Sequence, residues 1–401
     1  MDKHKNQKWC KCLPRNPEKL RIAMLGQKRI PSLEGGVEVV AEALSTRMVR
    51  LGHEVTCYNR KGHHVCGTEY DHAYQQNYQG VRCIEVFTIE KIGLAAVTSS
   101  FSATLRAALG HYDVVHIHAE GPAAMCWLPR LMGKRVIVTI HGLDHQREKW
   151  GKFAKWYILI GEKATVRFSH EIVVLSRAAQ RYFREKYCRK TVYIPNGVDR
   201  LPFRQAKEII EKWVLKRDGY FLYLGRIVPE KGIRHLIKAF RKVSTEKKLV
   251  IAGGGSNTDT FFQEMKTLAD ADERVLFTGF VQGTLKEELF SNAYAYVLPS
   301  NVEGMPLSLL EALNYGNCCL TSDISECTEV TEGRQPVFRK DDTEDLRRKL
   351  QALADDPAAV AAYKESTADI LQGRYDWDTI TAETLRLYTA QSSVAGESGN
   401  I

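Results

Sequence analysis

Short apolar runs rich in β-branched residues alternate with amphipathic segments along most of the chain, and this rhythm constrains the fold more than any other feature. The run LRIAML (20–25) reads as a strand, and an amphipathic helix that ends near Gly52 follows it after a polar loop. The alternation continues to about residue 200 and restarts with YFLYLG (220–225). Because helical crossovers join parallel strands, the pattern predicts an α/β protein with two doubly wound parallel sheets.

The rhythm also predicts two Rossmann-like domains. In chain order we expect a flexible basic tail (1–18), an N-terminal domain (19–200), a C-terminal domain (201–375), a helix that packs back on the N-terminal domain (376–391) and a disordered tail (392–401). Ligands of such sheets bind at the carboxyl ends of the strands. The two domains are therefore expected to face each other across a cleft.

Charge is distributed unevenly along the 401 residues, whose formal net charge is +9. Residues 1–200 hold 32 Lys and Arg against 18 Asp and Glu, a net of +14, and the remaining residues hold 25 against 30, a net of −5. A basic half favours an anionic partner, such as a membrane surface or an anionic ligand. No recognised nucleic-acid-binding module accompanies the basic residues, so we expect no nucleic-acid partner.

Cysteine usage and hydropathy bear on location. The ten cysteines form no C-x-x-C pair, and several lie in apolar runs, as in a reducing compartment. Cys10 and Cys12 lie in the basic tail without an assigned role. The first residues lack the apolar core of a secretory signal, and no window of about 20 apolar residues is present. We expect a cytoplasmic protein and leave open peripheral attachment to the inner face of the plasma membrane.

The strongest motif is SNVEGMPLSLLEAL, in which Glu303 and Glu311 are eight residues apart. Gly304 permits close backbone approach, and Pro306 suits the first turn of a helix. The amides that follow Gly304 would then point into the cleft from a helix N-terminus, where a phosphate binds well. The two carboxylates can accept hydrogen bonds from sugar hydroxyls. The plainer alternative is a pair of solvated helix glutamates.

A second motif, LGRIVPEKGI, places two cations after a predicted strand. Arg226 and Lys231 lie in a loop, and Gly232 begins the next helix. Arg can bind two oxygens at once, while Lys acts as a point charge. Together they predict an anion site that suits a diphosphate without a metal ion.

Weaker signals come from the first half of the chain. Gly35 and Gly36 precede a helix without the G-x-G-x-x-G fingerprint, so they favour phosphate contact but not dinucleotide binding. His141 follows the strand VTI and is expected to face the cleft. His116 and His118 alternate on one strand and could hold a metal, but no nearby carboxylate completes such a site.

A basic, aromatic segment spans residues 147–167. Arg147, Lys149, Lys152 and Trp156 are the residues in it that we assign to acceptor or membrane contact. A basic helix that carries aromatic residues can lie on an anionic bilayer surface. The alternative is a helix packed on the sheet with a solvated basic edge.

These motifs, together with I-H-G and Y-I-P-N-G-V-D, resemble those of the retaining glycosyltransferases of family 4, which have the GT-B fold. The resemblance covers about residues 20–390. It implies sugar transfer, with retention at the anomeric carbon, from a nucleotide-diphosphate sugar (UDP-, dTDP- or GDP-linked) to a glycan or lipid-linked acceptor, with no metal cofactor. The start R-I-P-S-L-E-G-G-V-E is similar to bacterial capsular and exopolysaccharide transferases, some of them rhamnosyltransferases.

The resemblance also implies roles for individual residues. Glu303 would contact the donor sugar, Glu311 the ribose, and the base would lie near Phe280–Val281. The implied catalytic residues are His141, Arg226, Lys231 and Glu303. The implied donor-binding residues are Gly35, Gly36, Arg226, Lys231, Gly253, Gly254, Val281, Glu303, Gly304, Met305, Pro306, Leu307 and Glu311.

Two other classes of enzyme remain in view. A nucleotide-sugar epimerase shares the two-lobed fold and would convert its donor with no acceptor present. A Rossmann oxidoreductase is disfavoured because the glycine fingerprint is missing.

Overall fold

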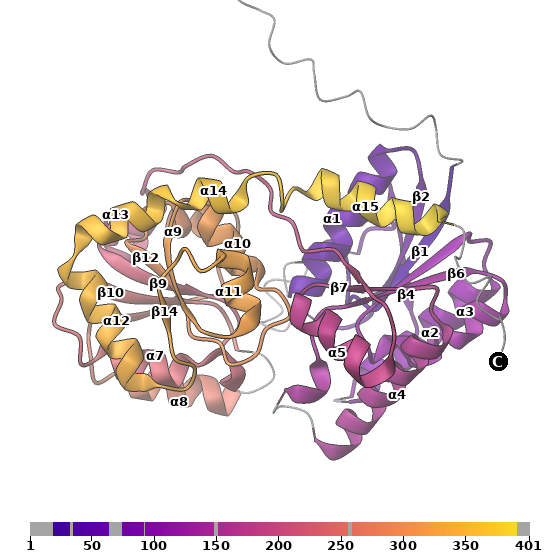
Figure 1. Cartoon of the computed structure of the whole chain (residues 1–401), viewed down its shortest axis with the longest axis horizontal. Helices are drawn as coiled ribbons and strands as arrows, with labels where there is room; N and C mark the ends of the chain where they lie inside the picture. The colour runs from indigo at the N-terminus through magenta and orange to yellow at the C-terminus, as the bar shows by residue number, and fades with distance from the viewer. Residues whose placement is uncertain are drawn as a thin grey trace, which may run out of the picture.

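Two β-sheets, each with helices on both faces, form two lobes that lie side by side (Figure 1). The computed structural model describes residues 19–32, 35–63, 74–91, 93–147, 151–255 and 259–390. The expectations for the tail 1–18 with its two cysteines, for Lys149 and for the tail 392–401 therefore lie outside the described residues.

The first sheet has eight strands and lies in the N-terminal lobe. Its spatial order is β3 (Asn77–Tyr78), β4 (Val81–Val86), β2 (Glu54–Arg60), β1 (Arg21–Leu25), β5 (Val114–His118), β6 (Arg135–Ile140), β7 (Glu171–Val174) and β8 (Val192–Tyr193). The strands are parallel except β3, which pairs antiparallel with β4. Gln79 and Gly80, both with positive φ, make the tight turn between them, so the edge of the sheet departs from the all-parallel prediction.

The second sheet has six strands, all parallel, in the C-terminal lobe. Its order is β11 (Val275–Gly279), β10 (Lys248–Ala252), β9 (Tyr220–Leu224), β12 (Ala295–Leu298), β13 (Cys318–Ser322) and β14 (Val337–Phe338). This is the doubly wound arrangement that the sequence pattern predicts. The two fully buried rings of Tyr220 and Phe221 help to fill its core.

The helices follow the predicted rhythm. In the first lobe they are α1 (Gly36–Arg50), α2 (Leu94–Leu109), η2 (Pro122–Met125), α3 (Trp127–Leu131), η3 (Asp144–Gln146), α4 (Lys152–Phe168) and α5 (Arg177–Tyr187). The rest are α6 (Glu208–Trp213), η4 (Pro229–Lys231), α7 (Ile233–Phe240), α8 (Asp259–Ala269), α9 (Gly283–Asn292), α10 (Leu307–Asn314), α11 (Ser325–Thr331), α12 (Thr343–Asp355), α13 (Pro357–Glu365), α14 (Thr367–Leu371) and α15 (Trp377–Thr389).

Two helices differ from expectation. The apolar stretch 122–133 favours one helix by its sequence, but it divides into the 3₁₀ turn η2 and the short α3. The basic helix begins only at Lys152, because Gly151 is its N-cap in an extended conformation. Arg147 therefore lies before this helix. Among the described helices, none is both long and apolar enough to cross a membrane.

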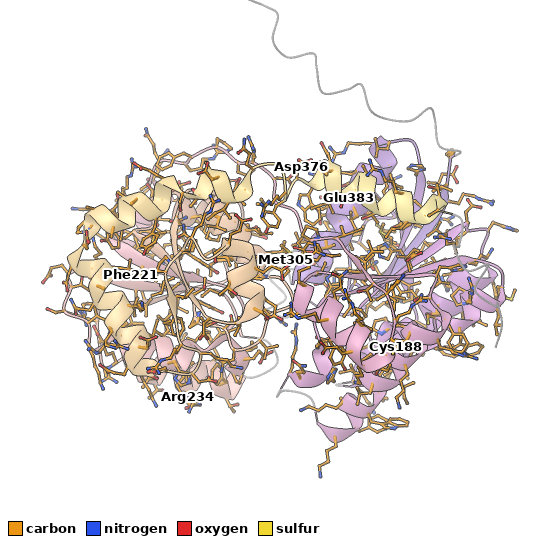
Figure 2. The ribbon with its side chains drawn as sticks, in the orientation of Figure 1. Cys188, Phe221, Arg234, Met305, Asp376 and Glu383 are labelled. Carbon is orange, nitrogen blue, oxygen red and sulfur yellow. The ribbon has the colours of Figure 1, made fainter. Side chains whose placement is uncertain are left out.

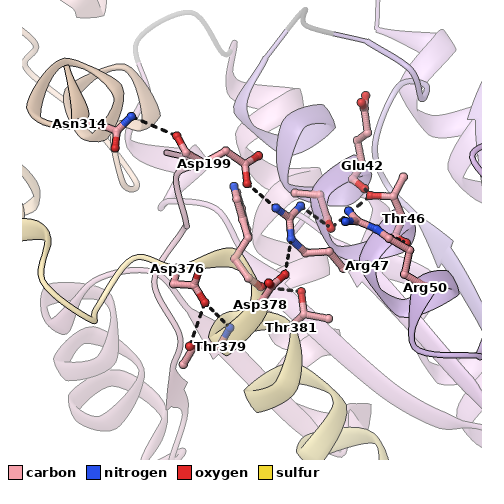
Figure 3. A network of polar contacts seen from close by, with 12 residues as sticks. Glu42, Thr46, Arg47, Arg50, Asp199, Asn314, Asp376, Asp378, Thr379 and Thr381 are labelled. Atoms are coloured by element: carbon pink, nitrogen blue, oxygen red, sulfur yellow. Dashed lines mark hydrogen bonds and ion pairs between the residues drawn. The ribbon is translucent and has the colours of Figure 1, made fainter. Parts of the chain in front are cut away.

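The last helix, α15, returns from the second lobe and lies against α1 and β6 of the first (Figure 1). Arg47 of α1 holds two connecting segments at this point, since its guanidinium pairs with Asp199 and, at 3.0 Å, with Asp378 (Figure 3). Asn314 of α10 donates to the Asp199 carbonyl at 3.1 Å. The ring of Trp377 packs so closely on Gly197 that an added Cβ would lie 2.5 Å from it.

Candidate active site between the two lobes

The centre of the site is an ion pair at the mouth of the second lobe. Lys231 Nζ lies 2.5 Å from Glu303 Oε1, and both side chains are largely buried. Burial by itself raises the pKa of a carboxyl, but the charge and hydrogen bond of Lys231 outweigh it, so the pKa of Glu303 lies below its usual value. The structure thus joins the two strongest sequence motifs at one point.

Gly232 explains why these motifs meet. It is the N-cap of α7 with a φ of +68°, and a Cβ there would lie 2.0 Å from the Pro299 carbonyl oxygen. Only glycine combines this conformation with this approach. The loop after β9 and the loop after β12 are therefore pressed together, which brings Lys231 against Glu303.

The two lobes touch at their backbones beside this pair. A Cβ on Gly304 would lie 1.7 Å from the His141 carbonyl oxygen, and a Cβ on Gly142 would lie 3.1 Å from Gly304 Cα. A cavity of about 420 Å³ opens next to the contact. It is lined from both lobes, among others by Gly142, Gln146, Tyr182, Asn301, Glu303, Gly304, Glu326 and Lys340.

His141 follows the end of β6 and is held by a second histidine. Its Nε2 lies 3.0 Å from Nδ1 of His118, which is fully buried. Burial, followed by the charges of His118 and Arg147, holds the pKa of His141 well below its usual value, so this imidazole is neutral near pH 7. His116 contacts Tyr388 at 2.6 Å and Thr139 at 2.7 Å, and these hydroxyls occupy both of its ring nitrogens.

Two arginines come from the segments that also carry Lys231 and His141. Within the described ranges the Arg226 guanidinium has no hydrogen-bond or ion-pair partner, and only the Arg226 carbonyl is bound, by Tyr223 Oη at 2.8 Å. Arg147 pairs with Asp144 at 2.9 Å, and its side chain is 16% exposed. Its charge helps to lower the pKa of Glu303. Arg147 thus lies at the cleft, whereas Lys152 and Trp156 are exposed on α4.

The predicted glycines lie near the cleft, with identifiable packing roles. A Cβ on Gly36 would meet Leu307 Cδ1 at 3.4 Å, so the Gly35–Gly36 loop faces the start of α10. A Cβ on Gly253, whose φ is +147°, would lie 1.8 Å from the Gly225 carbonyl oxygen. The Gly254 carbonyl accepts a hydrogen bond from the Ile227 amide at 3.0 Å. These contacts hold the ends of β9 and β10 together.

The remaining residues that were predicted to bind the donor lie around α10 and β11. Met305 is buried between the lobes (Figure 2), where its sulfur faces the Asn196 amide at 3.0 Å. Pro306 is the N-cap of α10 and has no N–H, so among residues 305–307 only Met305 and Leu307 offer backbone amides. Glu311 pairs with Lys286 at 2.6 Å, and Val281 is buried just after β11.

Several buried acids were missed by sequence reasoning. Glu230, inside the second motif, has both carboxylate oxygens buried without a partner. Glu120 and Glu162 lie buried in the first lobe. Glu162 lies in the basic segment 147–167 and shares the helix face of Ile158 and Thr165, which are also buried. That i, i+4, i+7 spacing is the signal that could have revealed it.

Two family descriptions match successive parts of the chain. Residues 34–200 match "Glycosyltransferase Family 4", and residues 205–369 match "Glycosyl transferases group 1". The chain belongs to the family 4 glycosyltransferases. The fold agrees with this assignment, since its two facing α/β lobes form a GT-B structure.

Relatives and solved structures resemble the chain over most of its length. An uncharacterized glycosyltransferase of Methanocaldococcus jannaschii is 23% identical over 94% of this chain and 100% of its own. An Escherichia coli UDP-Gal:alpha-D-GlcNAc-diphosphoundecaprenol alpha-1,3-galactosyltransferase is 27% identical over 65% of this chain and 71% of its own.

Among solved structures, a sucrose-phosphate synthase from Thermosynechococcus elongatus superposes with a TM-score of 0.76 at 19% identity, covering 92% of this chain and 98% of its own. The Anabaena protein HepE in complex with UDP and glucose superposes with a TM-score of 0.73 at 16% identity. The match covers 91% of this chain and 99% of HepE. At these identities the likeness concerns the fold.

Proposed function

We propose that the protein transfers a sugar, with retention of anomeric configuration, from a nucleotide-diphosphate sugar to a glycan or lipid-linked acceptor in bacterial surface polysaccharide synthesis. The observation that carries the proposal is the buried Lys231–Glu303 pair beside the unpartnered Arg226. This arrangement supplies two cations for a diphosphate and one carboxylate for sugar hydroxyls. That HepE was solved with UDP and glucose supports a UDP-linked donor, with dTDP and GDP as the alternatives.

Arg226 and Lys231 would lower the barrier by stabilising the departing diphosphate, together with the amides of Met305 and Leu307. The bond from the anomeric carbon to the diphosphate oxygen breaks as the acceptor oxygen forms its bond on the same face. The acceptor proton passes to the released diphosphate oxygen. Lys231 already neutralises Glu303, so we assign Glu303 to sugar binding and not to nucleophilic attack. No metal takes part in this proposal.

The acceptor would approach through the first lobe. Large apolar side chains are exposed on three neighbouring helices, namely Phe101, Leu105 and Leu109 on α2, Leu131 on α3 and Phe153 and Trp156 on α4. Phe153 is 75% exposed, and its ring lies tilted against that of Trp156 with 5.7 Å between ring centroids. Exposed apolar groups beside Lys152 suit an anionic bilayer and therefore a lipid-linked acceptor. The E. coli relative acts on a diphosphoundecaprenol-linked sugar.

Membrane attachment is tested by flotation with vesicles that contain anionic lipid. We expect binding at low salt that falls when Phe153 and Trp156 are both replaced by Ser. Ile210→Ser on α6 is the matched control, because Ile210 is an exposed apolar residue away from this face. Absence of binding at low salt would remove the membrane part of the proposal.

The transfer itself is tested by screening UDP-, dTDP- and GDP-sugars for thermal stabilisation and then for transfer. We expect one donor class to stabilise the protein and to yield a product with the donor's anomeric configuration. Inversion, or a trapped glycosyl-enzyme adduct, would contradict the mechanism. Conversion of the donor sugar with no acceptor would indicate an epimerase.

A further inference from the structure

A group of side chains meets inside the first lobe, apart from the Lys231–Glu303 pair. Glu120 lies after β5, His145 in η3 and Glu162 in α4. One nitrogen of His145 and one oxygen of each glutamate all lie within 4.8 Å of one another. The elements are forced together at Gly161, where a Cβ would lie 1.9 Å from the Glu120 carbonyl oxygen.

Each carboxylate in this group is fixed through one oxygen and leaves the other without a partner. Glu120 Oε2 accepts a hydrogen bond from the Asp144 backbone amide at 3.0 Å. Glu162 Oε1 accepts hydrogen bonds from Tyr182 at 2.9 Å, Lys186 at 3.0 Å and Tyr187. Glu120 Oε1 and Glu162 Oε2 are buried and unpartnered, in residues that are only 1% and 0% exposed.

His145 completes the group. Its Nδ1 faces Glu162 Oε2 at 3.3 Å but is not aligned for a hydrogen bond, so it too is buried without a partner. Its Nε2 lies 3.5 Å from Tyr182 Oη. Three unsatisfied ligand atoms from three elements therefore point at one place. A single buried polar atom without a partner has several possible explanations, but three that converge on one point are best explained by a bound ion.

The charges show what that species must supply. Two carboxyl groups are buried together, and among the described residues the one cation bonded to them is Lys186, on the far oxygen of Glu162. Two carboxylates that share a buried site need a proton or a cation between them. A proton shared between the carboxylates would satisfy both oxygens but would leave His145 Nδ1 unpartnered.

We propose that Glu120, His145 and Glu162 bind a divalent first-row transition ion such as Zn²⁺ or Mn²⁺. One imidazole and two carboxylates suit these ions, whereas Mg²⁺ and Ca²⁺ prefer oxygen ligands alone. The ion would tie η2, η3 and α4 together. It would thereby fix the segment 141–147, which reaches the second lobe. None of the three ligands belongs to the donor-binding set, so the site stands whether or not the transfer proposal holds.

The test is the metal content and thermal stability of the full chain, purified without a chelator and without a histidine tag. We expect close to one equivalent of a transition ion. After chelation, Zn²⁺ or Mn²⁺ at a hundredfold excess over its Kd should raise the Tm of the first lobe by about 5–10 °C. His145→Ala should lose both effects, and it should fold because this side chain is not fully buried.

Glu162→Gln is a second, nearly isosteric variant that should also lose the ion. His111→Ala and Glu185→Gln, which change exposed residues of the same lobe, are the matched controls and should keep it. The proposal is overturned if less than about a tenth of an equivalent is found and neither ion shifts the Tm. It is equally overturned if His145→Ala retains the metal, which would show adventitious binding elsewhere.

Discussion

At the scale of single residues, the site depends on charges that are buried together. Lys231 and Glu303 neutralise each other in a place that excludes most water. Removing either one leaves the other uncompensated, and a lone buried charge is costly. The guanidinium of Arg226, by contrast, has no partner among the described residues. A diphosphate would therefore meet one free cation and one that it must share with Glu303.

Lys231→Ala should lower kcat/KM for transfer, because a cation at the leaving group is lost. The expected loss of transition-state stabilisation is roughly 2–4 kcal/mol. The pKa of Glu303 should rise in this variant, since Lys231 supplies the two largest of the effects that oppose burial. The pH–rate profile should accordingly shift to higher pH. Steady-state kinetics across pH measures both effects.

Arg234→Ala serves as the control for Lys231→Ala. Arg234 is a partly exposed cation on α7 that pairs with Glu264, outside the residues that line the cavity. An unchanged kcat/KM in Lys231→Ala would show that this lysine is not at the reacting centre.

The buried histidines should make stability depend on acid. Burial lowers the pKa of His118 to about 4. It also holds the pKa values of His116 and His141 well below the usual value for histidine. In the unfolded chain these histidines take up protons at about pH 6.5, whereas in the folded protein they do so only at much lower pH. Their contribution to the free energy of unfolding is therefore full above about pH 6.5 and is lost as the pH falls toward about 4. His118 alone should contribute about 3 kcal/mol to that loss.

Urea unfolding at a series of pH values measures this dependence. His118→Asn should reduce the slope between pH 4.5 and 6 by about 1.4 kcal/mol per pH unit, the value for one proton. Replacing the exposed His111 by Ala should leave the slope unchanged. A slope in His118→Asn equal to that of the unmodified protein would contradict the pKa assignment.

At the scale of elements, α15 joins the lobes. Besides its contact with Arg47, α15 contacts the first lobe through two further hydrogen bonds. The Tyr388 hydroxyl bonds to His116, and the Leu387 carbonyl accepts a hydrogen bond from Arg135 Nε at 2.6 Å. The Trp377 ring lies under the Arg47 guanidinium, 6.0 Å from its carbon. These contacts make α15 part of the first lobe in packing, although it follows the second lobe in sequence.

Arg47→Ala should destabilise the protein by about 1–2 kcal/mol, since it removes two ion pairs with exposed carboxylates and the packing of a mostly buried side chain. Arg50→Ala, one turn on, is the matched control, because the contact recorded for its side chain is a long one of 3.5 Å to the Thr46 carbonyl. Equal unfolding midpoints for the two variants in urea would show that the Arg47 cluster contributes nothing.

At the scale of the whole molecule, the lobes meet backbone to backbone at Gly142 and Gly304. No side chain separates them there, so the residues after β6 reach the loop after β12. Transfer between a donor on one lobe and an acceptor on the other requires that approach. Displacement of reacting groups by about 1 Å can cost on the order of 100-fold in rate.

Gly304→Ala should therefore lower kcat by on the order of 100-fold. The new methyl group would overlap the His141 carbonyl oxygen and hold the lobes apart, while the Tm of each lobe should change little. Donor affinity, measured by calorimetry, should fall much less than kcat. Gly151→Ala is the control, since a Cβ there has open space. Normal turnover in Gly304→Ala would show that the observed contact is not needed for the reaction.

The sequence predicts the architecture well, because strand and helix periods are written locally in runs such as YFLYLG. Both motifs were expected at strand ends, which parallel strands bring together, but the direct ion pair of Lys231 with Glu303 was not predicted. The partners of His141 and the burial of Glu162 could not be read in this way. They depend on how η2, η3 and α4 approach one another, and that approach is set at single glycines such as Gly161. The roles of the individual donor residues remain predictions.

Because α15 packs on the first lobe but lies near the C-terminus, the first lobe can be completed only after the second lobe has been synthesised. A ribosome releases all strands of the first sheet long before Trp377 and Tyr388 emerge, and domains generally fold as they appear. Until then β6 lacks its covering helix, and His116 lacks its phenolic partner. A chain interrupted anywhere in the second lobe would carry an unfinished first lobe. In such a chain the face of the first sheet that α15 covers would stay exposed.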